Sequence, residues 1–176
     1  MHHEILCAGF GGQGILFSGK LIAYIGMLKD QEISWLPSYG PEMRGGTANC
    51  SVIISDTAVG SPLVLKPSAL MVMNLPSLDK FEETVIPGGK IFIDSSLVTR
   101  SVERTDVKSY SLPATGLANE HKFPKLANVI MVGKMIKELE LCDLDFVRTV
   151  VEKVVPAGKP ELVDLNMKAI RLGYDA

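Results

Sequence analysis

The stretch Gly9-Phe10-Gly11-Gly12-Gln13-Gly14 decides the fold of this chain. It follows the apolar segment Glu4–Ala8, which is typical of a β-strand, and precedes Ile15–Leu28, where apolar residues recur at helical spacing. A glycine-rich turn between a strand and a helix is the context in which a G-x-G-x-x-G pattern is informative. Glycines accept positive φ and leave no Cβ in the way of a ligand, and the first helical amides have no partner within the helix. We therefore predict that the turn contacts a phosphate, nucleotide or cofactor. The alternatives are that it completes a neighbouring subunit's site or is a purely structural link. The candidate ligand-binding residues are Gly9, Gly11, Gly12, Gln13 and Gly14.

The rest of the chain alternates between predicted strands and predicted helices. Expected strands lie near residues 33–35, 48–55, 70–74, 90–94 and 107–112, and expected helices span 13–29, 77–84, 126–139, 143–155 and 160–173. Alternation of apolar and polar residues predicts that strand 48–55 is half-buried. This order predicts an α/β fold in one domain, residues 1–176, with three layers and a mostly parallel sheet carrying helices on both faces. The glycine turn falls at the carboxyl edge of that sheet, where such folds bind ligands. Asp94 ends a strand at the same edge, where it would line the crevice or cap the next turn.

The composition narrows the class of protein. The 176 residues are 47% hydrophobic and 22% charged, which is typical of a folded globular protein. The net charge of −2 gives no electrostatic case for nucleic acid, and no apolar run reaches the ~20 residues that span a bilayer. Cys7, Cys50 and Cys142 are widely spaced, form no iron–sulfur or other metal motif, and indicate a reducing environment. Because the N-terminus also lacks a signal-peptide pattern, we expect a cytoplasmic protein.

The segment Leu36–Gly46 combines glycines and prolines with large side chains and is predicted to be irregular. A stretch of this length without secondary structure in a compact domain is typically functional. Tyrosine and arginine are enriched in interface cores, and a guanidinium can hold a carboxylate or phosphate with two parallel hydrogen bonds. We predict that Tyr39, Glu42 and Arg44 form an interface or a ligand clamp. The alternative is a surface loop with a solvated Glu42–Arg44 pair.

The sequence does not contain a complete catalytic set. No Ser/His/Asp or Cys/His arrangement is apparent, so we name no catalytic residue and no metal site. A dinucleotide fingerprint would also place a carboxylate about 20 positions beyond the turn, at the end of the second strand. That strand is followed by Leu36-Pro37-Ser38, which argues against NAD or FAD. We expect no cofactor to be held by this chain alone.

Two passages together identify a family resemblance. GFGGQG at Gly9–Gly14 and WLPSYGPEMRGGTANCSVIIS at Trp35–Ser55 resemble the gamma subunit of the 2-oxoacid:ferredoxin oxidoreductases, a part of the pyruvate/ketoisovalerate oxidoreductase family. These sequences are most similar to those of the 2-oxoglutarate and 2-oxoisovalerate type. Further similarity covers nearly the whole chain, at Ser61–Val64, Asn74–Glu82, Gly88–Ser96 and Asn166–Tyr174.

The resemblance implies a part in a multi-subunit enzyme. Such complexes convert a 2-oxoacid, coenzyme A (CoA) and oxidised ferredoxin into acyl-CoA, carbon dioxide and reduced ferredoxin. Thiamine diphosphate, Mg and the iron–sulfur clusters would lie on partner subunits of the alpha, beta and delta type, and CoA would be a substrate. By this resemblance, the amides of Gly11–Gly14 and the side chain of Gln13 face the CoA cleft. The Tyr39–Gly46 loop docks on the catalytic subunits, and 2-oxoglutarate is the expected substrate.

Other assignments stay open. The small subunit of indolepyruvate oxidoreductase shares the glycine loop, although the sequence PSYGPEMRGGT argues against that subunit. A stand-alone nucleotide-binding module could use the same loop. The isolated chain is expected to be inactive, and a two-fold homodimer is the default expectation for its oligomeric state because such dimers are the commonest soluble oligomers.

Overall fold

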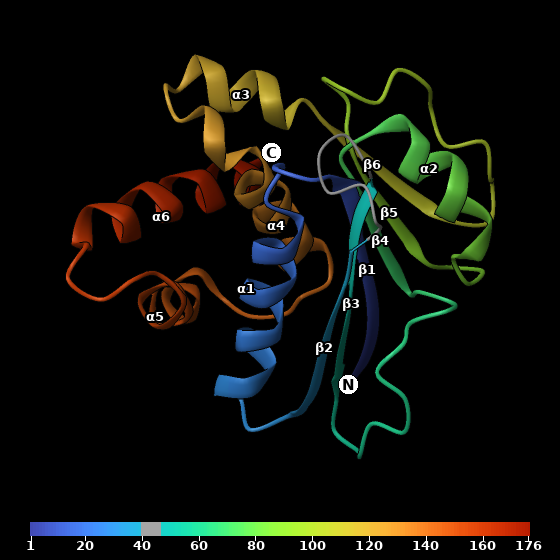
Figure 1. Ribbon diagram of the computed structural model, residues 1–176, viewed down its shortest axis with the longest axis horizontal. Coiled ribbons are helices and arrows are strands. Elements are labelled where there is room, and N and C mark those ends of the chain that lie inside the picture. The colour runs from blue at the N-terminus through green and yellow to red at the C-terminus, as the bar shows by residue number, and fades with distance from the viewer. Residues whose placement is uncertain (40–46) are drawn as a thin grey trace.

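The computed structural model describes residues 1–39 and 47–176 and has a six-stranded sheet at its centre (Figure 1). In the order of the sheet the strands are β2 (Glu32–Tyr39), β3 (Thr47–Ser55), β1 (His2–Phe10), β4 (Ala69–Val72), β5 (Lys90–Asp94) and β6 (Lys108–Leu112). The helices are α1 (Ile15–Leu28), α2 (Leu75–Phe81), α3 (Ala114–Glu120), α4 (Ala127–Glu138), α5 (Leu144–Val154) and α6 (Pro160–Asp175), with short 3-10 helices η1 (Glu82–Thr84) and η2 (Pro124–Leu126).

The sheet is mixed, with most strands running in one direction. The pairs β1–β4, β4–β5 and β5–β6 are parallel. Strand β3 is antiparallel to both of its neighbours, β1 and β2, so among the six strands of the described ranges it alone runs against the others. The prediction of a mostly parallel sheet in an α/β fold is confirmed, with β3 as the exception.

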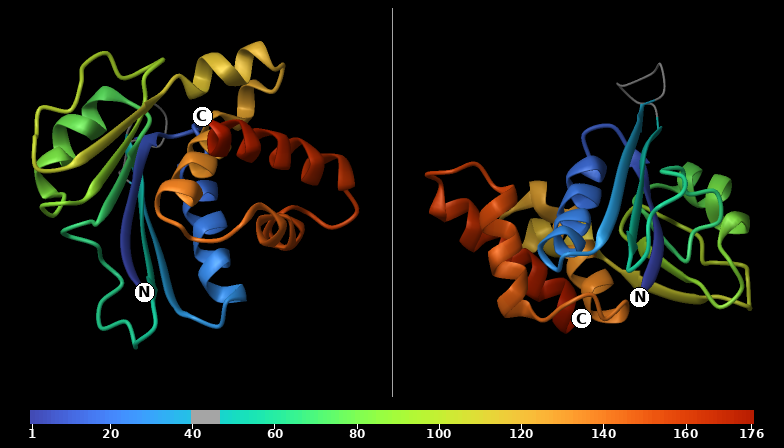
Figure 2. Two further views of the ribbon diagram at one scale, coloured as in Figure 1. Left: turned by 180° about the vertical axis from the view of Figure 1, so that it is seen from behind. Right: turned by 90° about the horizontal axis from the view of Figure 1, so that it is seen from below.

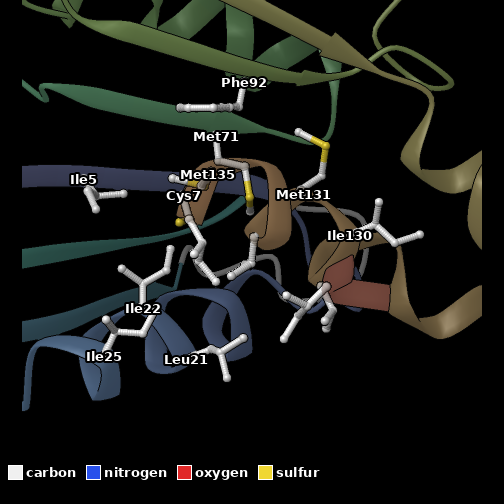
Figure 3. Packing of buried hydrophobic residues seen from close by; sticks show 14 of the residues in the cluster. Ile5, Cys7, Leu21, Ile22, Ile25, Met71, Phe92, Ile130, Met131 and Met135 are labelled. Atoms are coloured by element: carbon white, nitrogen blue, oxygen red, sulfur yellow. The ribbon is translucent and has the colours of Figure 1, made fainter. Parts of the chain in front are cut away.

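Helices cover both faces of the sheet, as predicted (Figures 1 and 2). Alternate residues of a strand point to opposite faces, so in β1 Ile5 and Cys7 join one apolar cluster and Leu6 and Ala8 join the other. The first cluster contains residues of α1 and α4, on which α5 and α6 pack. Figure 3 shows side chains of α1 and α4 next to those of the strands. The second cluster is smaller and is covered by α2.

The helices α4 and α6 cross where each presents a glycine. A Cβ added to Gly133 would fall on the carbonyl oxygen of Ile170, and one added to Gly173 would fall on that of Ile130. The two backbones therefore lie closer than side chains would allow. This contact fixes α6 against α4.

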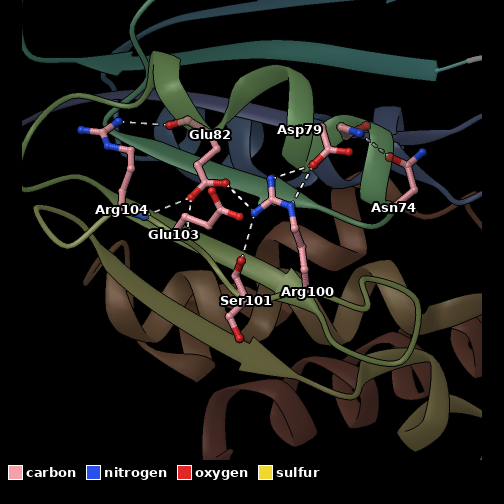
Figure 4. Close-up of polar contacts among 8 residues, drawn as sticks. Asn74, Asp79, Glu82, Arg100, Ser101, Glu103 and Arg104 are labelled. Atoms are coloured by element: carbon pink, nitrogen blue, oxygen red, sulfur yellow. Dashed lines mark hydrogen bonds and ion pairs between the residues drawn. The ribbon is translucent and has the colours of Figure 1, made fainter.

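The α2 face is tied down by a buried carboxylate (Figure 4). The Glu82 side chain is 4% exposed and accepts hydrogen bonds from the Arg100 guanidinium at 2.7 Å and from the N–H of Glu103 at 2.6 Å. Arg104 donates to the carbonyl oxygens of Glu82 and Val85 at 3.0 and 2.5 Å. Burial opposes the ionisation of Glu82, but Arg100 and the backbone N–H groups of Glu103 and Arg104, the latter at 3.2 Å, outweigh it and hold the pKa of Glu82 below its usual value. These contacts bind the segment between β5 and β6 to the end of α2.

Some boundaries differ from the sequence prediction. The segment predicted to be irregular from Leu36 onward continues β2 as far as Tyr39, and its register with β3 runs without interruption. Pro37 is compatible with this strand because β2 is at the edge of the sheet, where a proline nitrogen can face away from the neighbouring strand. Strand β4 ends at Val72 rather than Asn74, and α2 begins at Leu75 rather than Ser77.

One further prediction was wrong in detail, and one helix has no counterpart in the sequence prediction. Strand β3 is buried on both faces from Cys50 to Ser55, not half-buried. The segment around Val64 covers its second face, and the Val64 N–H donates to the Ser51 hydroxyl at 3.2 Å. Helix α3 was not predicted, because it is short, contains Gly116 and begins without a side-chain cap. It forms where Ala118 and its neighbours are buried against the rest of the core.

None of the helices in residues 1–39 and 47–176 is both long enough and apolar enough to cross a membrane.

Candidate functional site

The glycine turn joins β1 to α1 through two left-handed residues. Gly12 has φ of 89° and Gly14 has φ of 76°, values that side chains disfavour. Gly14 occupies the N-cap position of α1, so no side chain of its own caps the helix. Among residues 1–39 and 47–176, a Cβ at Gly12 would meet nothing within 4 Å, whereas one at Gly9 would lie 2.6 Å from Gln13 Oε1. Gly9 is therefore needed for close packing, while Gly11 and Gly12 are exposed.

Gln13 ties the turn to the neighbouring strand. Its Oε1 accepts from the Phe10 N–H at 2.6 Å, and its Nε2 donates to the Met73 carbonyl oxygen at 2.9 Å, just beyond β4. The Phe10 carbonyl oxygen also accepts from the Gln13 N–H at 3.2 Å. Both functional groups of the Gln13 carboxamide thus have partners within the chain.

The turn lies at the carboxyl ends of two adjacent parallel strands. After β1 the chain enters α1 on one face of the sheet, and after β4 it enters α2 on the opposite face (Figure 1). Adjacent strands whose connections leave to opposite faces open a crevice between their carboxyl ends, which is the usual ligand position in open α/β sheets. The predicted location of the turn at this edge is confirmed.

The sheet order also bears on the dinucleotide question. Strand β3 separates β2 from β1, so the end of β2 is not adjacent to the glycine turn. Glu32, the carboxylate at the expected sequence distance, stands at the start of β2, at the opposite end of the sheet. In this arrangement Glu32 does not reach the position where a dinucleotide fold holds its ribose.

Two polar residues follow the neighbouring strands. Asn74 is 2% exposed and caps α2 by accepting from the Ser77 N–H at 2.8 Å, while its Nδ2 has no partner among the described residues. Asp94 is fully buried and accepts from the Ser96 N–H at 3.1 Å and from the Thr115 hydroxyl at 2.5 Å. Of the two roles proposed for Asp94, the structure therefore supports capping of the following turn.

Asn128, which the sequence analysis did not single out, contacts the turn from α4. It is 3% exposed, and its Nδ2 donates to the Gly14 carbonyl oxygen at 2.9 Å and to the Ser18 hydroxyl at 3.2 Å. Asn128 also lines an open groove of about 680 Å³ that runs from the turn along α1 and η2, together with Gly12, Gly14, Phe17, Lys125 and Leu126. The signal for Asn128 is a single carboxamide at the start of an apolar run, since seven of the eight residues after it are apolar or glycine.

The second predicted cluster cannot be placed. Glu42 and Arg44 lie outside the described residues, and Tyr39 is the last residue of β2. The interface or ligand clamp of Tyr39, Glu42 and Arg44 stays a prediction.

The three cysteines are free thiols, of which Cys7 and Cys50 are buried and Cys142 is partly buried. Cys7 and Cys50 face each other across β1 and β3 and are both fully buried. Interaction with the Cys50 thiol, together with burial, raises the pKa of Cys7 well above its usual value, and burial raises the pKa of Cys142 to about 12. Neither Cys7 nor Cys142 is therefore a thiolate at neutral pH. Within residues 1–39 and 47–176, no group of three or more His, Cys, Asp and Glu side chains is arranged to hold a metal ion.

The sheet and its turn define an α/β domain with a glycine turn at the point where the strand connections change face. Residues 4–176 match the family described as pyruvate ferredoxin/flavodoxin oxidoreductase, and the chain belongs to this family. The family resemblance predicted from the sequence is confirmed.

The named relatives include subunits of ketoisovalerate oxidoreductase and of 2-oxoglutarate synthase. Over 98% of its length the chain is 40% identical to the ketoisovalerate oxidoreductase subunit VorA of Methanothermobacter thermautotrophicus, and it spans about a third (36%) of that relative. It is 34% identical to the 2-oxoglutarate synthase subunit KorC of Methanocaldococcus jannaschii, with 99% of this chain and 94% of the relative covered.

Solved structures show the same fold. The gamma subunit of a keto/oxoacid ferredoxin oxidoreductase from Geobacter sulfurreducens superposes with a TM-score of 0.83 at 27% identity, covering 98% of this chain and 96% of that one. A 2-oxoglutarate:ferredoxin oxidoreductase from Magnetococcus marinus, solved with 2-oxoglutarate, coenzyme A and succinyl-CoA, gives a TM-score of 0.87 at 21% identity, covering 99% of this chain and 30% of that one.

Proposed function

We propose that this chain is the gamma subunit of a multi-subunit 2-oxoacid:ferredoxin oxidoreductase and that its glycine turn forms part of the CoA cleft. The complex would convert a 2-oxoacid, CoA and oxidised ferredoxin into acyl-CoA, carbon dioxide and reduced ferredoxin. In this assignment residues 1–176 act as one domain that contributes a binding surface, while the bond-breaking chemistry belongs to partner subunits.

The observation that carries the proposal is the position of the turn. Gly12 and Gly14 are left-handed, a Cβ at Gly12 would meet none of the described residues, and the turn lies at the switch between β1 and β4. The amides that begin α1 lie at the favourable end of its helix dipole, which attracts anions such as the phosphates of CoA. The candidate ligand residues are Gly9, Gly11, Gly12, Gln13 and Gly14, with Gly9 and the Gln13 side chain shaping the turn from within.

The substrate is proposed from the relatives. KorC relatives match along nearly their whole length, and the Magnetococcus marinus enzyme was solved with 2-oxoglutarate and CoA. We therefore propose 2-oxoglutarate as the 2-oxoacid. The 40% identity to VorA makes 2-oxoisovalerate the competing substrate, and both belong in the same assay.

The partners would supply the remaining chemistry. We propose alpha-, beta- and delta-type subunits that carry thiamine diphosphate, Mg and iron–sulfur clusters, a ferredoxin that accepts electrons from the complex, and a cytoplasmic location. Anaerobic purification of the tagged chain from its own cells, followed by mass spectrometry, tests this assembly. Recovery of thiamine- and cluster-binding subunits is expected. Recovery of the chain alone, under conditions that preserve other complexes, would contradict the proposal and favour the stand-alone nucleotide-binding module.

The CoA role is tested by a matched pair of glycine variants. Gly12 and Gly158 both have left-handed φ, 89° and 81°, and a Cβ at either position would have no neighbour within 4 Å in the part of the chain that the structure describes. Alanine should therefore cost similar backbone strain at both sites, about 1 kcal/mol. In the assembled complex, with viologen reduction as the assay, Gly12→Ala should raise the KM for CoA, while Gly158→Ala should leave it unchanged. Equal CoA KM values in the two variants would show that the turn is a structural link only.

The docking role of Tyr39, Glu42 and Arg44 has its own test. Arg44→Ala should weaken co-purification of the catalytic subunits or raise the KM for CoA, because a guanidinium that holds a carboxylate or phosphate is lost. A variant complex that assembles normally and keeps its CoA KM would remove both roles from Arg44.

A further inference from the structure

The glycine turn is held from two sides by carboxamide side chains. Gln13 joins it to the end of β4 through Met73, at 2.9 Å, and Asn128 joins it to α4 through Gly14, also at 2.9 Å. We propose that Asn128 and Gln13 are positioning residues that hold the turn in the conformation that binds CoA. This inference rests on the proposed function and extends it to a residue 114 positions from the turn.

The Asn128 contact exceeds what hydrogen-bond satisfaction requires. The Gly14 carbonyl oxygen already accepts from the Ser18 N–H at 3.0 Å and from the Ser18 hydroxyl at 3.1 Å, which use its two lone pairs. Burying a carboxamide costs free energy, and asparagine is a poorer helix former than leucine or methionine. An apolar residue would therefore suit this part of α4 better if packing alone mattered. The particular effect of Asn128 is to set where the turn lies relative to α4.

Gly14 and Asn128 fit each other sterically. A Cβ at Gly14 would lie 2.5 Å from Asn128 Nδ2 and 2.7 Å from its Cγ, so a side chain at position 14 would displace the carboxamide. Gly14 also has left-handed φ. The turn thus depends on glycine at this position both for its backbone conformation and for the contact with α4.

The Gln13 carboxamide is matched to its two partners in one orientation. The Phe10 N–H requires an acceptor, and the Met73 carbonyl oxygen requires a donor. A glutamate would keep the first bond and place a carboxylate oxygen against the second carbonyl. Replacing Gln13 with glutamate therefore removes the link to β4 with almost no change in side-chain shape.

A turn that is already in its binding conformation does not have to be ordered when the ligand arrives, and this lowers the cost of binding. Loss of either positioning contact should accordingly weaken CoA binding without altering the chemistry on partner subunits. The expected signature is a higher KM for CoA with unchanged kcat at saturating CoA. A general loss of folded protein would instead lower kcat and leave both KM values as they were.

The experiment uses the assembled complex with viologen as electron acceptor. Asn128→Asp keeps the side-chain shape but loses the donor to Gly14, and Gln13→Glu loses the donor to Met73. Each should raise the KM for CoA about five- to tenfold, the effect of one hydrogen bond, with the KM for the 2-oxoacid unchanged. Asn166→Asp is the matched control, because Asn166 is also buried, lines the same groove and donates through its Nδ2 to Leu162 within α6 at 2.8 Å. It therefore adds a carboxylate to the groove without removing a contact to the turn.

The outcomes separate this inference from the proposed function. A wild-type complex without saturable dependence on CoA would overturn the proposed function itself. A wild-type complex that saturates with CoA, while Asn128→Asp and Gln13→Glu match Asn166→Asp, would overturn the positioning role alone. If Asn128→Asp does not fold, Gln13→Glu decides, since Gln13 is only partly buried and tolerates the change more readily.

Discussion

The two faces of the sheet are stabilised in different ways. On the face of α1 and α4, the apolar cluster is large, and the outer helix α6 packs closely on α4 at Gly133 and Gly173 (Figures 1 and 3). On the face of α2, the apolar cluster is small and an irregular segment is bound by the Glu82 carboxylate and its arginines (Figure 4). Helices can cover apolar surface by close backbone contact, whereas an irregular segment has unpaired backbone groups that need polar partners.

This difference also places the candidate site. The turn lies at the point where the chain passes from β1 to the face of α1 and α4, beside the point where it passes from β4 to the face of α2. Asn128 contacts the turn from α4, and the Met73 carbonyl oxygen, just beyond β4, receives the Gln13 bond. The turn is therefore held both by a helix and by the end of the adjacent strand.

The largest effect is expected at the helix crossing. Gly133→Ala would place a Cβ on the Ile170 carbonyl oxygen, and because both groups belong to backbone in packed helices, α6 must move away. We expect the free energy of unfolding to fall by about 3 kcal/mol, measured by urea denaturation. Gly116→Ala in α3 is the control, since its Cβ would be 3.3 Å from the Ser96 hydroxyl and alanine favours a helix. Equal stability of the two variants would contradict close contact between α4 and α6.

An intermediate effect is expected on the polar face. Glu82→Gln removes the charge that Arg100 and two backbone N–H groups stabilise, and it places an amide donor where only acceptors are useful. The loss should be about 2 kcal/mol at neutral pH, the range for hydrogen bonds to a charged group. Glu83→Gln changes the exposed neighbour and should have almost no effect. A Glu82 variant as stable as the Glu83 variant would mean that the α2 face needs no buried charge.

The contribution of Glu82 should also depend on pH. Its pKa is lowered in the folded state, so its stabilisation is fully present above the pKa of the unfolded chain and is lost as pH falls through the folded pKa. The difference in unfolding free energy between the wild type and Glu82→Gln should therefore be constant at neutral pH and shrink below about pH 4.5. Denaturation curves from pH 7 to pH 3 measure it. A difference that grows on acidification would reverse the assigned direction of the shift.

The sequence predicts those parts of the molecule that depend on local pattern. The strand–turn–helix at β1 and α1 and the buried run of β5 follow from spacing alone, and the glycine turn was correctly placed at the carboxyl edge. Helix α3 lacks a local start signal and forms through contacts with α4. The relation of Asn128 to Gly14 joins residues that local periodicity does not connect. Likewise, the sequence of α4 does not show that Gly133 is needed, because the need arises from the close approach of the α6 backbone.

The smallest effect is expected for a charged pair outside both clusters. Arg148 bridges Glu152 and Asp164 at 3.8 and 3.0 Å, much as Arg100 bridges Asp79 and Glu82 at 2.7 Å each. Arg148 is 50% exposed and its acids are 54% and 61% exposed, so solvent screens the attraction.

Arg148→Ala should therefore lower the unfolding free energy by no more than about 0.5 kcal/mol, and added salt should remove the difference. Arg100→Ala, which leaves the Glu82 carboxylate buried with one partner fewer, should cost several times more and keep most of its effect in salt. Urea denaturation of both variants at low and high salt makes the comparison. Similar losses in the two variants would contradict this explanation. They would mean that burial of the Glu82 carboxylate does not make its ion pair stronger than the exposed pairs of Arg148.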